Sequence, residues 1–445
     1  MRGQRPPSTH RCAGRERLPE DCLLVLRIAR VLTYLLDWAG LLVRWLHFVA
    51  GVAWIGASFY FVWLDNHLQP LADEEGAAAD VAGELWAVHG GGFYRSRKYR
   101  VAPARLPPTL HWFYWEAYTT WLSGFALLCL LYFLRAEAYL IDPDVAAFTK
   151  SSAVAIALAF LIASWLIYDG ACRSPLGRNS RALTIFLGVL IAAEAWALCH
   201  VFSGRGAFMM FGSALGTLMA ANVLFVIIPG QRELVHAKQQ GREPDAAPGL
   251  RGKQRSVHNT YFTLPVLFVM ISNHYAMTYG ARHNWLVLIA LSFAGACIRA
   301  WFVARHKPQE RSGYARAMPA VLGVLTLAGV VLALAPSLNV KPASARASGP
   351  AVDGAFAPGP AADGARVQMI VEQRCVPCHA ESPTEPGFNA PPNGIVLESI
   401  EQVLTHLPQV QQQLAMRTMP LGNLTGMTDD ERTALLMWIG HGARR

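Results

Sequence analysis

The stretch Leu41-Leu42-Val43-Arg44-Trp45-Leu46-His47 begins an apolar run that continues to Phe61-Val62-Trp63. A helix of ~20 apolar residues is long enough to cross the hydrocarbon core of a bilayer. Seven further runs of near-spanning length follow, at 111–133, 152–168, 182–202, 207–229, 261–280, 284–304 and 317–336. The sequence therefore predicts an all-α protein whose larger part is an eight-helix transmembrane bundle in a lipid bilayer.

Composition divides the 445 residues into four parts. Residues 1–30 are arginine-rich, and we interpret them as an upstream start-codon choice or a disordered segment; a ninth, very short span is the alternative. Residues 31–336 form the membrane domain, and 337–364, rich in Ala, Pro, Gly and Ser, read as a flexible linker. Residues 365–445 form a small domain. The net charge of +9 is spread over loops that face a membrane, so it predicts no nucleic-acid partner.

Lysine and arginine are unevenly divided between the loops of the membrane domain. Eighteen lie in loops 64–110, 169–181, 230–260 and 305–316, against four in the opposite loops. Since basic loops stay in the cytoplasm, the small C-terminal domain is predicted on the outer, periplasmic side of a bacterial inner membrane. This topology also places the arginine-rich N-terminus outside, which is the reason for the start-codon interpretation.

The C-terminal part contains Cys375-Val376-Pro377-Cys378-His379, the attachment signature of a c-type haem. Cys375 and Cys378 would bind the haem covalently, and His379 would ligate its iron. A redox-active cysteine pair needs a βαβ context, and a zinc site needs a second ligand pair. The chain has no second Cys-x-x-Cys.

The surrounding residues are typical of a small class I cytochrome c. Residues 367–372 read as a short helix before the motif, and Thr428 and Glu431 form a capping box for a second helix, about 429–441. Met419, held in a loop by the following proline and glycine, is the predicted sixth iron ligand. Met416 and Met427 are its rivals, and any of the three could instead be a packing residue.

Three histidines fall at the outer level of the membrane domain in this topology: His47, His200 and His274. A histidine inside a span is by default a functional residue. His47 and His274 are our candidates for binding a haem b; the alternative is that each imidazole hydrogen-bonds a neighbouring helix. Glu194, deep in the fourth run, is a candidate for proton relay or substrate contact, or a protonated, hydrogen-bonded side chain.

On the cytoplasmic side, His89-Gly90-Gly91-Gly92-Phe93-Tyr94 closes a loop, and His258 opens the sixth run. Three glycines allow backbone amides to approach an anion or a planar ligand closely. An ordinary turn is the alternative reading of both segments.

Several of these blocks resemble the bacterial membrane-bound urate hydroxylases, a family with a C-terminal cytochrome c domain. The similar segments cover about residues 36–445 except the linker. They are Arg44–His47, Ala53–Phe61, His89–Tyr94, His258–Asn259, Tyr261–Phe268, Met270–Tyr275 and Met419–Asn423.

The resemblance implies oxidation of urate to 5-hydroxyisourate without hydrogen peroxide, with electrons leaving through haem c to a soluble cytochrome c or a terminal oxidase. Candidate residues for stacking on urate and moving its protons are His89, His111, Glu194 and His258, with Trp112, Trp115 and Tyr261 beside them. Two other classes stay open: a membrane dehydrogenase for quinol or another small substrate, and a membrane-anchored cytochrome c that only carries electrons.

Overall fold

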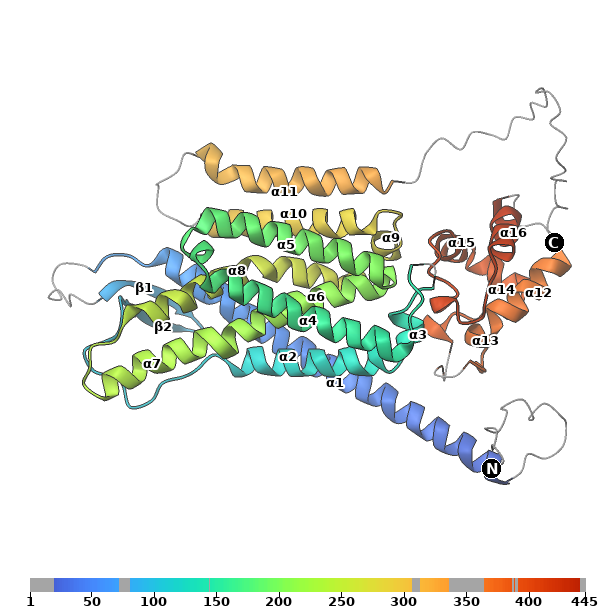
Figure 1. Cartoon of the computed structure of the whole chain (residues 1–445), viewed down its shortest axis with the longest axis horizontal. Coiled ribbons are helices and arrows are strands. Elements are labelled where there is room, and N and C mark those ends of the chain that lie inside the picture. Colours follow the sequence, from blue (N-terminus) through green and yellow to red (C-terminus); the bar gives the residue numbers. More distant parts are fainter. Residues whose placement is uncertain are drawn as a thin grey trace, which may run out of the picture.

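The computed structural model describes residues 20–71, 81–143, 145–305, 313–335, 364–385, 388 and 391–440, and these are mostly helical (Figure 1). Six helical segments are long and apolar enough to cross a membrane, so the chain is a multi-pass membrane protein. They are Tyr34–His67 within α1 (Glu20–His67), α4 (Lys150–Arg173), α5 (Ser180–Val201), the continuous run Gly204–Gln239, α10 (Asn284–Ala304) and Tyr314–Ala333 within α11 (Gly313–Ala333). The long run contains α6 (Gly204–Asn222), a π-helix η4 (Val223–Ile227) and α7 (Ile228–Gln239).

Two of the eight predicted spans form helices that are too short or too polar to count among these six membrane-spanning segments. In the region 111–133, α2 (Trp115–Leu127) passes into a π-helix, η2 (Leu128–Phe133). In the region 261–280, α8 (Ala246–Ser272) is followed by a separate short helix, α9 (Ala276–Tyr279). The first half of α8 is polar and basic, which lowers its mean hydropathy. Both α2 and α8 nevertheless lie within the bundle (Figure 1).

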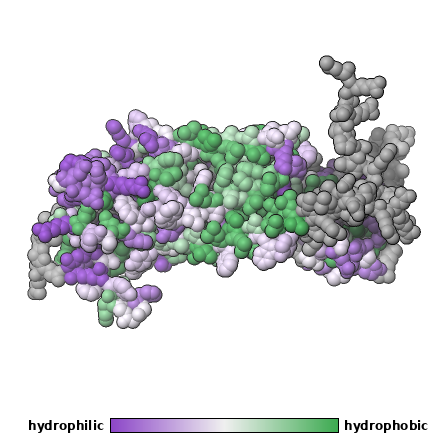
Figure 2. Space-filling model, turned by 90° about the horizontal axis from the view of Figure 1, so that it is seen from below, coloured by the Kyte–Doolittle hydropathy of each residue, from purple (hydrophilic) through white to green (hydrophobic). Residues whose placement is uncertain are grey.

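Helix α6 is the most enclosed helix of the bundle. Its buried side chains include Phe208, Phe211 and Leu215, which join residues of α4, α5 and α8 in one apolar core. Gly212 allows close packing, because a β-carbon there would lie 2.7 Å from Cγ1 of Val269 on α8. On the face drawn in Figure 2, an apolar belt surrounds the middle of the bundle, as expected of a surface in contact with lipid.

The basic loops lie together at one end of the bundle, which we call the basic end (residues 64–71, 81–110, 169–181 and 230–260; Figure 1). A two-stranded antiparallel hairpin stands there, formed by β1 (Val81–His89) and β2 (Gly92–Tyr99). This hairpin departs from the all-α prediction, which treated the segment as a loop. Glu84 stabilises it by pairing with Arg95 and Arg97 at 2.8 and 3.1 Å.

The C-terminal domain is a small helical unit. It contains α12 (Gly364–Arg374), α13 (Val376–His379), α14 (Ile400–Thr405), α15 (Leu407–Ala415) and α16 (Asp429–Gly440), with 3₁₀ turns η5 (Pro392–Gly394) and η6 (Leu421–Asn423). The predicted helices at 367–372 and 429–441 are confirmed as α12 and α16. Their buried residues share one core, comprising Val367, Ile370, Val371, Leu435, Trp438 and Ile439.

The C-terminal domain packs on the end of the bundle opposite the basic end, where the short helix α3 (Ala136–Tyr139) lies (Figure 1). A β-carbon on Gly422 would collide with the carbonyl oxygen of Glu137, and Met416 packs against the core of the bundle. A cavity of about 190 Å³ remains between the two parts, with Tyr139 on one side and Phe388 on the other. The two domains are therefore in direct contact.

The structure bears on two predicted segments, the N-terminal residues 1–30 and the linker at 337–364. Helix α1 begins at Glu20 and runs without a break past residue 30, so residues 20–30 are helical rather than disordered. Residues 1–19 and most of the predicted linker lie outside the described residues.

Candidate active site at the basic end

A buried hydrogen-bond network joins three helices near the basic end. The hydroxyl of Tyr168 on α4 lies 2.8 Å from Nδ1 of His258 on α8. Asn222, the last residue of α6, donates from Nδ2 to the Tyr168 hydroxyl and to Oδ1 of Asn259, at 2.9 Å each. Asn259 in turn donates to the carbonyl of Met219 at 3.0 Å. Such a network of satisfied polar groups rigidly fixes the side chains that take part in it.

A charged group completes the network. The Arg255 side chain, only 3% exposed, donates to Asp169 at 2.6 Å and to Asn222 at 3.4 Å, and its guanidinium lies 4.8 Å from the centre of the Tyr168 ring. Arg173 donates to the other oxygen of Asp169, also at 2.6 Å. Two guanidinium groups thus share one carboxylate, which leaves excess positive charge beside Tyr168.

Helix geometry explains how these residues come together. Arg255, His258, Asn259 and Phe262 lie three, four and seven positions apart on α8, so they share one face of the helix. Asp245 caps that helix by accepting the amide of Ala247 at 3.0 Å. On the facing side, the π-helix η4 begins directly after Asn222. π-Helical turns inside α-helices are frequently found at functional sites.

The network can move protons. Because the Tyr168 oxygen accepts a hydrogen bond from Asn222, its own O–H is available to donate to Nδ1 of His258. The thiol of Cys172 lies 4.0 Å from the same nitrogen. Among the described residues, no group of three or more His, Cys, Asp or Glu side chains could hold a metal ion. The side chains that meet in this network are hydrogen-bonding, charged and proton-carrying groups.

The other candidates on the basic side lie apart from this network. His89 is exposed at the end of β1, where it pairs with Gly92 across the hairpin turn. His111 is also exposed, and its ring centre lies 4.6 Å from that of Phe113. Of the basic-side histidines that the sequence singled out, the structure brings His258 into the buried network, and a role for the other two stays a prediction.

The candidates for a haem b occupy different surroundings. His47 packs on α2, with Nδ1 2.9 Å from the carbonyl of Thr120 and 3.2 Å from the Ser123 hydroxyl. Gly124 provides room for the ring, since a β-carbon there would lie 2.8 Å from it. His274 is exposed in the turn after α8. A haem b at His47 and His274 stays a prediction.

The remaining two polar candidates in the spans have local partners. Nδ1 of His200, which is exposed, lies 2.7 Å from the Trp196 carbonyl one turn earlier. Glu194 is buried and accepts a hydrogen bond from the Ser164 hydroxyl. Both interpretations of Glu194, a proton relay or substrate contact and a protonated, hydrogen-bonded side chain, stay predictions.

In the C-terminal domain, Cys375 follows α12 directly, and α13 presents Cys378 and His379 one turn later. Nδ1 of His379 lies 2.9 Å from the Ile395 carbonyl, so Nε2 is the ring nitrogen left for the predicted iron. Burial lowers the pKa of His379, which favours the neutral imidazole. Burial also raises the pKa of the Cys375 thiol to about 12.

The three candidate methionines, Met416, Met419 and Met427, have different surroundings in the structure. Met427 is 4% exposed and belongs to the domain core, while Met416 packs against the membrane bundle. Met419 is in neither core cluster. Its carbonyl accepts a 2.7 Å hydrogen bond from buried Arg432, which also donates to Leu414 at 3.2 Å. The backbone of Met419 is thus held by Arg432, and its role as the sixth iron ligand stays a prediction.

Sequence reasoning missed several functional candidates, namely Tyr168, Asp169, Asn222, Arg255 and Arg432. Two signals were present: Tyr168-Asp169 places a carboxylate at the end of an apolar run, and Arg255 lies one helical turn before His258. The sequence could not predict that Tyr168, Asp169, Asn222 and Arg255 meet, because they come from three different helices. Arg432 lies apart from them on α16.

The fold and the site define a multi-pass helical membrane protein with a buried, basic polar site and an appended small helical domain. The family model described as urate oxidase N-terminal matches residues 33–333, and the chain belongs to this family. The match covers the whole bundle and ends before the C-terminal domain. Family membership suggests an oxidoreductase with a role related to urate oxidation. Neither a curated protein nor a solved structure is significantly similar to the chain.

Proposed function

We propose that the protein is a membrane-bound urate hydroxylase that oxidises urate to 5-hydroxyisourate in purine catabolism. Urate and one water molecule give 5-hydroxyisourate, two protons and two electrons, so no hydrogen peroxide is formed. The observation that carries the proposal is the buried network of Tyr168, His258, Asn222 and Arg255, which lies inside the region that matches the urate oxidase family.

The network suits the two halves of this reaction. The addition of water to the purine ring releases protons. The imidazole of His258 can accept a proton, and its hydrogen bond to the Tyr168 hydroxyl can pass a proton between the two side chains. Arg255 and Arg173 supply positive charge that favours the binding of an anionic substrate. We assign the proton-transfer role to His258, with Tyr168 as its partner.

The electrons would leave at the opposite end of the molecule. The donor set of Cys375, Cys378, His379 and Met419 fits a covalently attached haem c, and the His379–Ile395 hydrogen bond matches the support that an iron-ligating histidine requires. When bound, the haem supplies one-electron transfer between the membrane domain and an external acceptor. We place this domain on the periplasmic side of a bacterial inner membrane, where a soluble cytochrome c or a terminal oxidase would accept the electrons.

Anaerobic reduction tests the proposal directly. Urate is added to the purified full-length protein, and the α-band of haem c and the ultraviolet spectrum of the product are followed. We expect reduction of the haem with formation of 5-hydroxyisourate, and no 5-hydroxyisourate in a Cys375→Ser/Cys378→Ser variant, which cannot attach the haem. If the haem stays oxidised with urate but is reduced by a quinol, the protein is a quinol dehydrogenase and the proposal is wrong.

The same spectra test the second cofactor. A b-type α-band that disappears in His47→Ala would support a haem b at His47 and His274. A spectrum with only a c-type band would rule out that site without affecting the urate proposal.

A further inference from the structure

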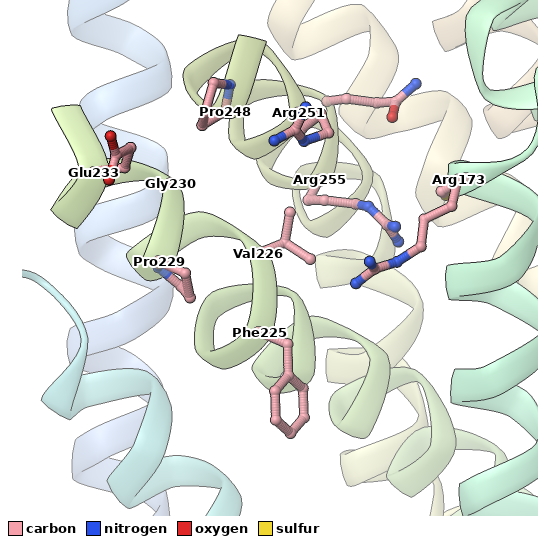
Figure 3. A pocket seen from close by; sticks show the side chains of 11 residues that line it. Arg173, Phe225, Val226, Pro229, Gly230, Glu233, Pro248, Arg251 and Arg255 are labelled. Atoms are coloured by element: carbon pink, nitrogen blue, oxygen red, sulfur yellow. The ribbon is translucent and has the colours of Figure 1, made fainter. Parts of the chain in front are cut away.

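A cavity of about 330 Å³ lies beside the buried network, between the end of α4, the π-helix η4 with the start of α7, and the first half of α8 (Figure 3). Its volume is at the lower end of the range for small-molecule sites, which suits a ligand the size of a bicyclic purine. Gly230 makes the close approach of α7 and α8 possible, because a β-carbon there would lie 2.8 Å from the carbonyl oxygen of Pro248. The cavity is thus built into the helix packing.

Three arginines line the cavity: Arg173, Arg251 and Arg255 (Figure 3). Arg173 and Arg255 lie side by side because both bind the carboxylate of Asp169. Arg251 is exposed and has no ion-pair partner among the described residues. The one acidic residue in the lining, Glu233, is paired with Arg242 at 3.5 Å. The cavity therefore carries unneutralised positive charge and favours an anion.

The remaining wall is apolar and includes Phe225, Val226 and Pro229. Phe225 is 57% exposed, and its ring centre lies 5.8 Å from that of Trp165. An aromatic side chain in the wall can stack on a planar ring, while arginines of the same cavity bind oxygens at the edge of that ring. This combination favours a planar, oxygen-rich anion over a compact one such as phosphate.

The cavity is connected to the proton-transfer network through two shared residues. Arg255 lines the cavity and binds Asn222, while Cys172 lines it and lies 4.0 Å from Nδ1 of His258. A ligand in the cavity would therefore lie one side chain away from the Tyr168–His258 pair.

We infer that this cavity is the binding site for the urate monoanion, with Arg251 and Arg173 recognising its oxygens and Phe225 stacking on its ring. The inference rests on the proposed function and adds to it the place where the substrate binds. Arg251 is the decisive residue, since it lines the cavity, is exposed, and contributes nothing visible to the fold.

Equilibrium dialysis of urate against the full-length protein tests the site without turnover, if the protein is kept fully reduced so that it cannot accept electrons. Arg251→Gln should weaken binding about tenfold or more, the expected loss for one charge-assisted hydrogen bond. The matched control is Lys253→Gln, an equal loss of charge at an exposed position two residues along α8 that does not line the cavity. Arg251→Lys, which keeps the charge but not the planar fork, should bind with intermediate affinity.

Equal binding by the wild type and Arg251→Gln would overturn the site, while haem reduction by urate in the wild type would leave the proposed function standing. Competition by inorganic phosphate at concentrations equal to those of urate would also overturn it, because the site would then be a general anion site. Wild-type protein that binds urate through Arg251 but does not oxidise it would support the site and contradict the proposed function.

Discussion

Tyr168 is the side chain on which the buried network converges. Its hydroxyl contacts His258 and Asn222, and its ring lies under the guanidinium of Arg255. Removing only the hydroxyl would leave the ring packed while the Nδ1 of His258 and the Nδ2 of Asn222 each lose a partner. Replacing Tyr168 by phenylalanine therefore tests its role in proton transfer without disturbing the packing of its ring.

We expect Tyr168→Phe to lower the rate of urate-dependent haem reduction by about tenfold to a hundredfold, within the range for a positioned acid–base group. The measurement is stopped-flow reduction under anaerobic conditions. Tyr132→Phe is the control, because Tyr132 is also buried and donates to Asn273 at 3.2 Å, but belongs to η2, outside the network. Equal rates for the two variants would contradict the role of Tyr168.

The methionines of the C-terminal domain give a second test at this scale. Met419→Ala should lower the haem potential while the haem stays attached, because thioether ligation raises it. Met427→Ala should leave the potential nearly unchanged and destabilise the domain by ~2–5 kcal/mol, the usual cost of emptying a core position. Redox titration and denaturant unfolding of both variants separate the two roles, and a lowered potential in Met427→Ala alone would reverse the assignment.

At the scale of elements, α16 is held to α12 by more than apolar contact. Arg374 at the end of α12 donates to both carboxylate oxygens of Glu431 at 2.9 and 3.0 Å. Glu431 also accepts the Thr428 amide at 2.8 Å, while its own amide donates to the Thr428 hydroxyl at 3.2 Å. The predicted capping box is thus present, and it is joined to the other helix by an ion pair.

This arrangement predicts a pH dependence. The hydrogen bond from Arg374 lowers the pKa of Glu431 in the folded domain below the ordinary value of ~4.3. The stabilisation is therefore fully present above that ordinary value and is lost as the pH falls through the lower, folded-state pKa. Hydrogen exchange of α16 should accelerate on acidification in the wild type and change less with pH in Glu431→Gln.

Asp430→Asn is the control for that experiment, since Asp430 is an exposed acid in the same helical turn. If it flattens the pH dependence as much as Glu431→Gln, the cause is general charge near the helix N-terminus and not the ion pair with Arg374.

At the scale of the whole molecule, the two ends of the bundle are chemically different. The basic end carries the polar network and the arginine-lined cavity, and the other end carries the docked C-terminal domain (Figure 1). Substrate would thus enter at one end and electrons leave at the other, which requires a fixed contact between bundle and domain. Gly422, with φ of +55°, is a close point of that contact, against Glu137 and Ala138.

Gly422→Ala should therefore slow electron transfer from the membrane domain to the haem, because the added methyl group collides with the backbone of α3. Gly426→Ala is a matched control with an almost equal φ of +64°, where the nearest atom to the new β-carbon is Nη1 of Arg374 at 3.8 Å, within the domain. Both variants carry the same backbone strain. Equal rates of urate-dependent haem reduction would show that docking does not limit transfer.

Much of this architecture could be predicted from local sequence signals. The apolar runs, the charge difference between loops, and the capping box at Thr428 each depend on residues close together in the chain. The same local reasoning began a span at residue 261 and assigned 230–260 to a loop, although α8 begins at Ala246 and its polar first half contains the buried Arg255. It also treated the hairpin at 81–99 as a loop, although β1 and β2 pair along their length and Glu84 binds Arg95 and Arg97 across them.

The sequence by itself determined the helical membrane bundle, its basic end, and the cysteine and histidine side chains offered to a haem. These features follow from hydrophobicity, charge and the spacing of residues along the chain, so they can be predicted without knowing which residues meet in the folded protein. The tertiary structure alone decided that Tyr168, Asn222, Arg255 and His258 form one network with a cavity beside it. Their meeting depends on how three helices pack, because each side chain finds its hydrogen-bond partner on a helix far away in the chain.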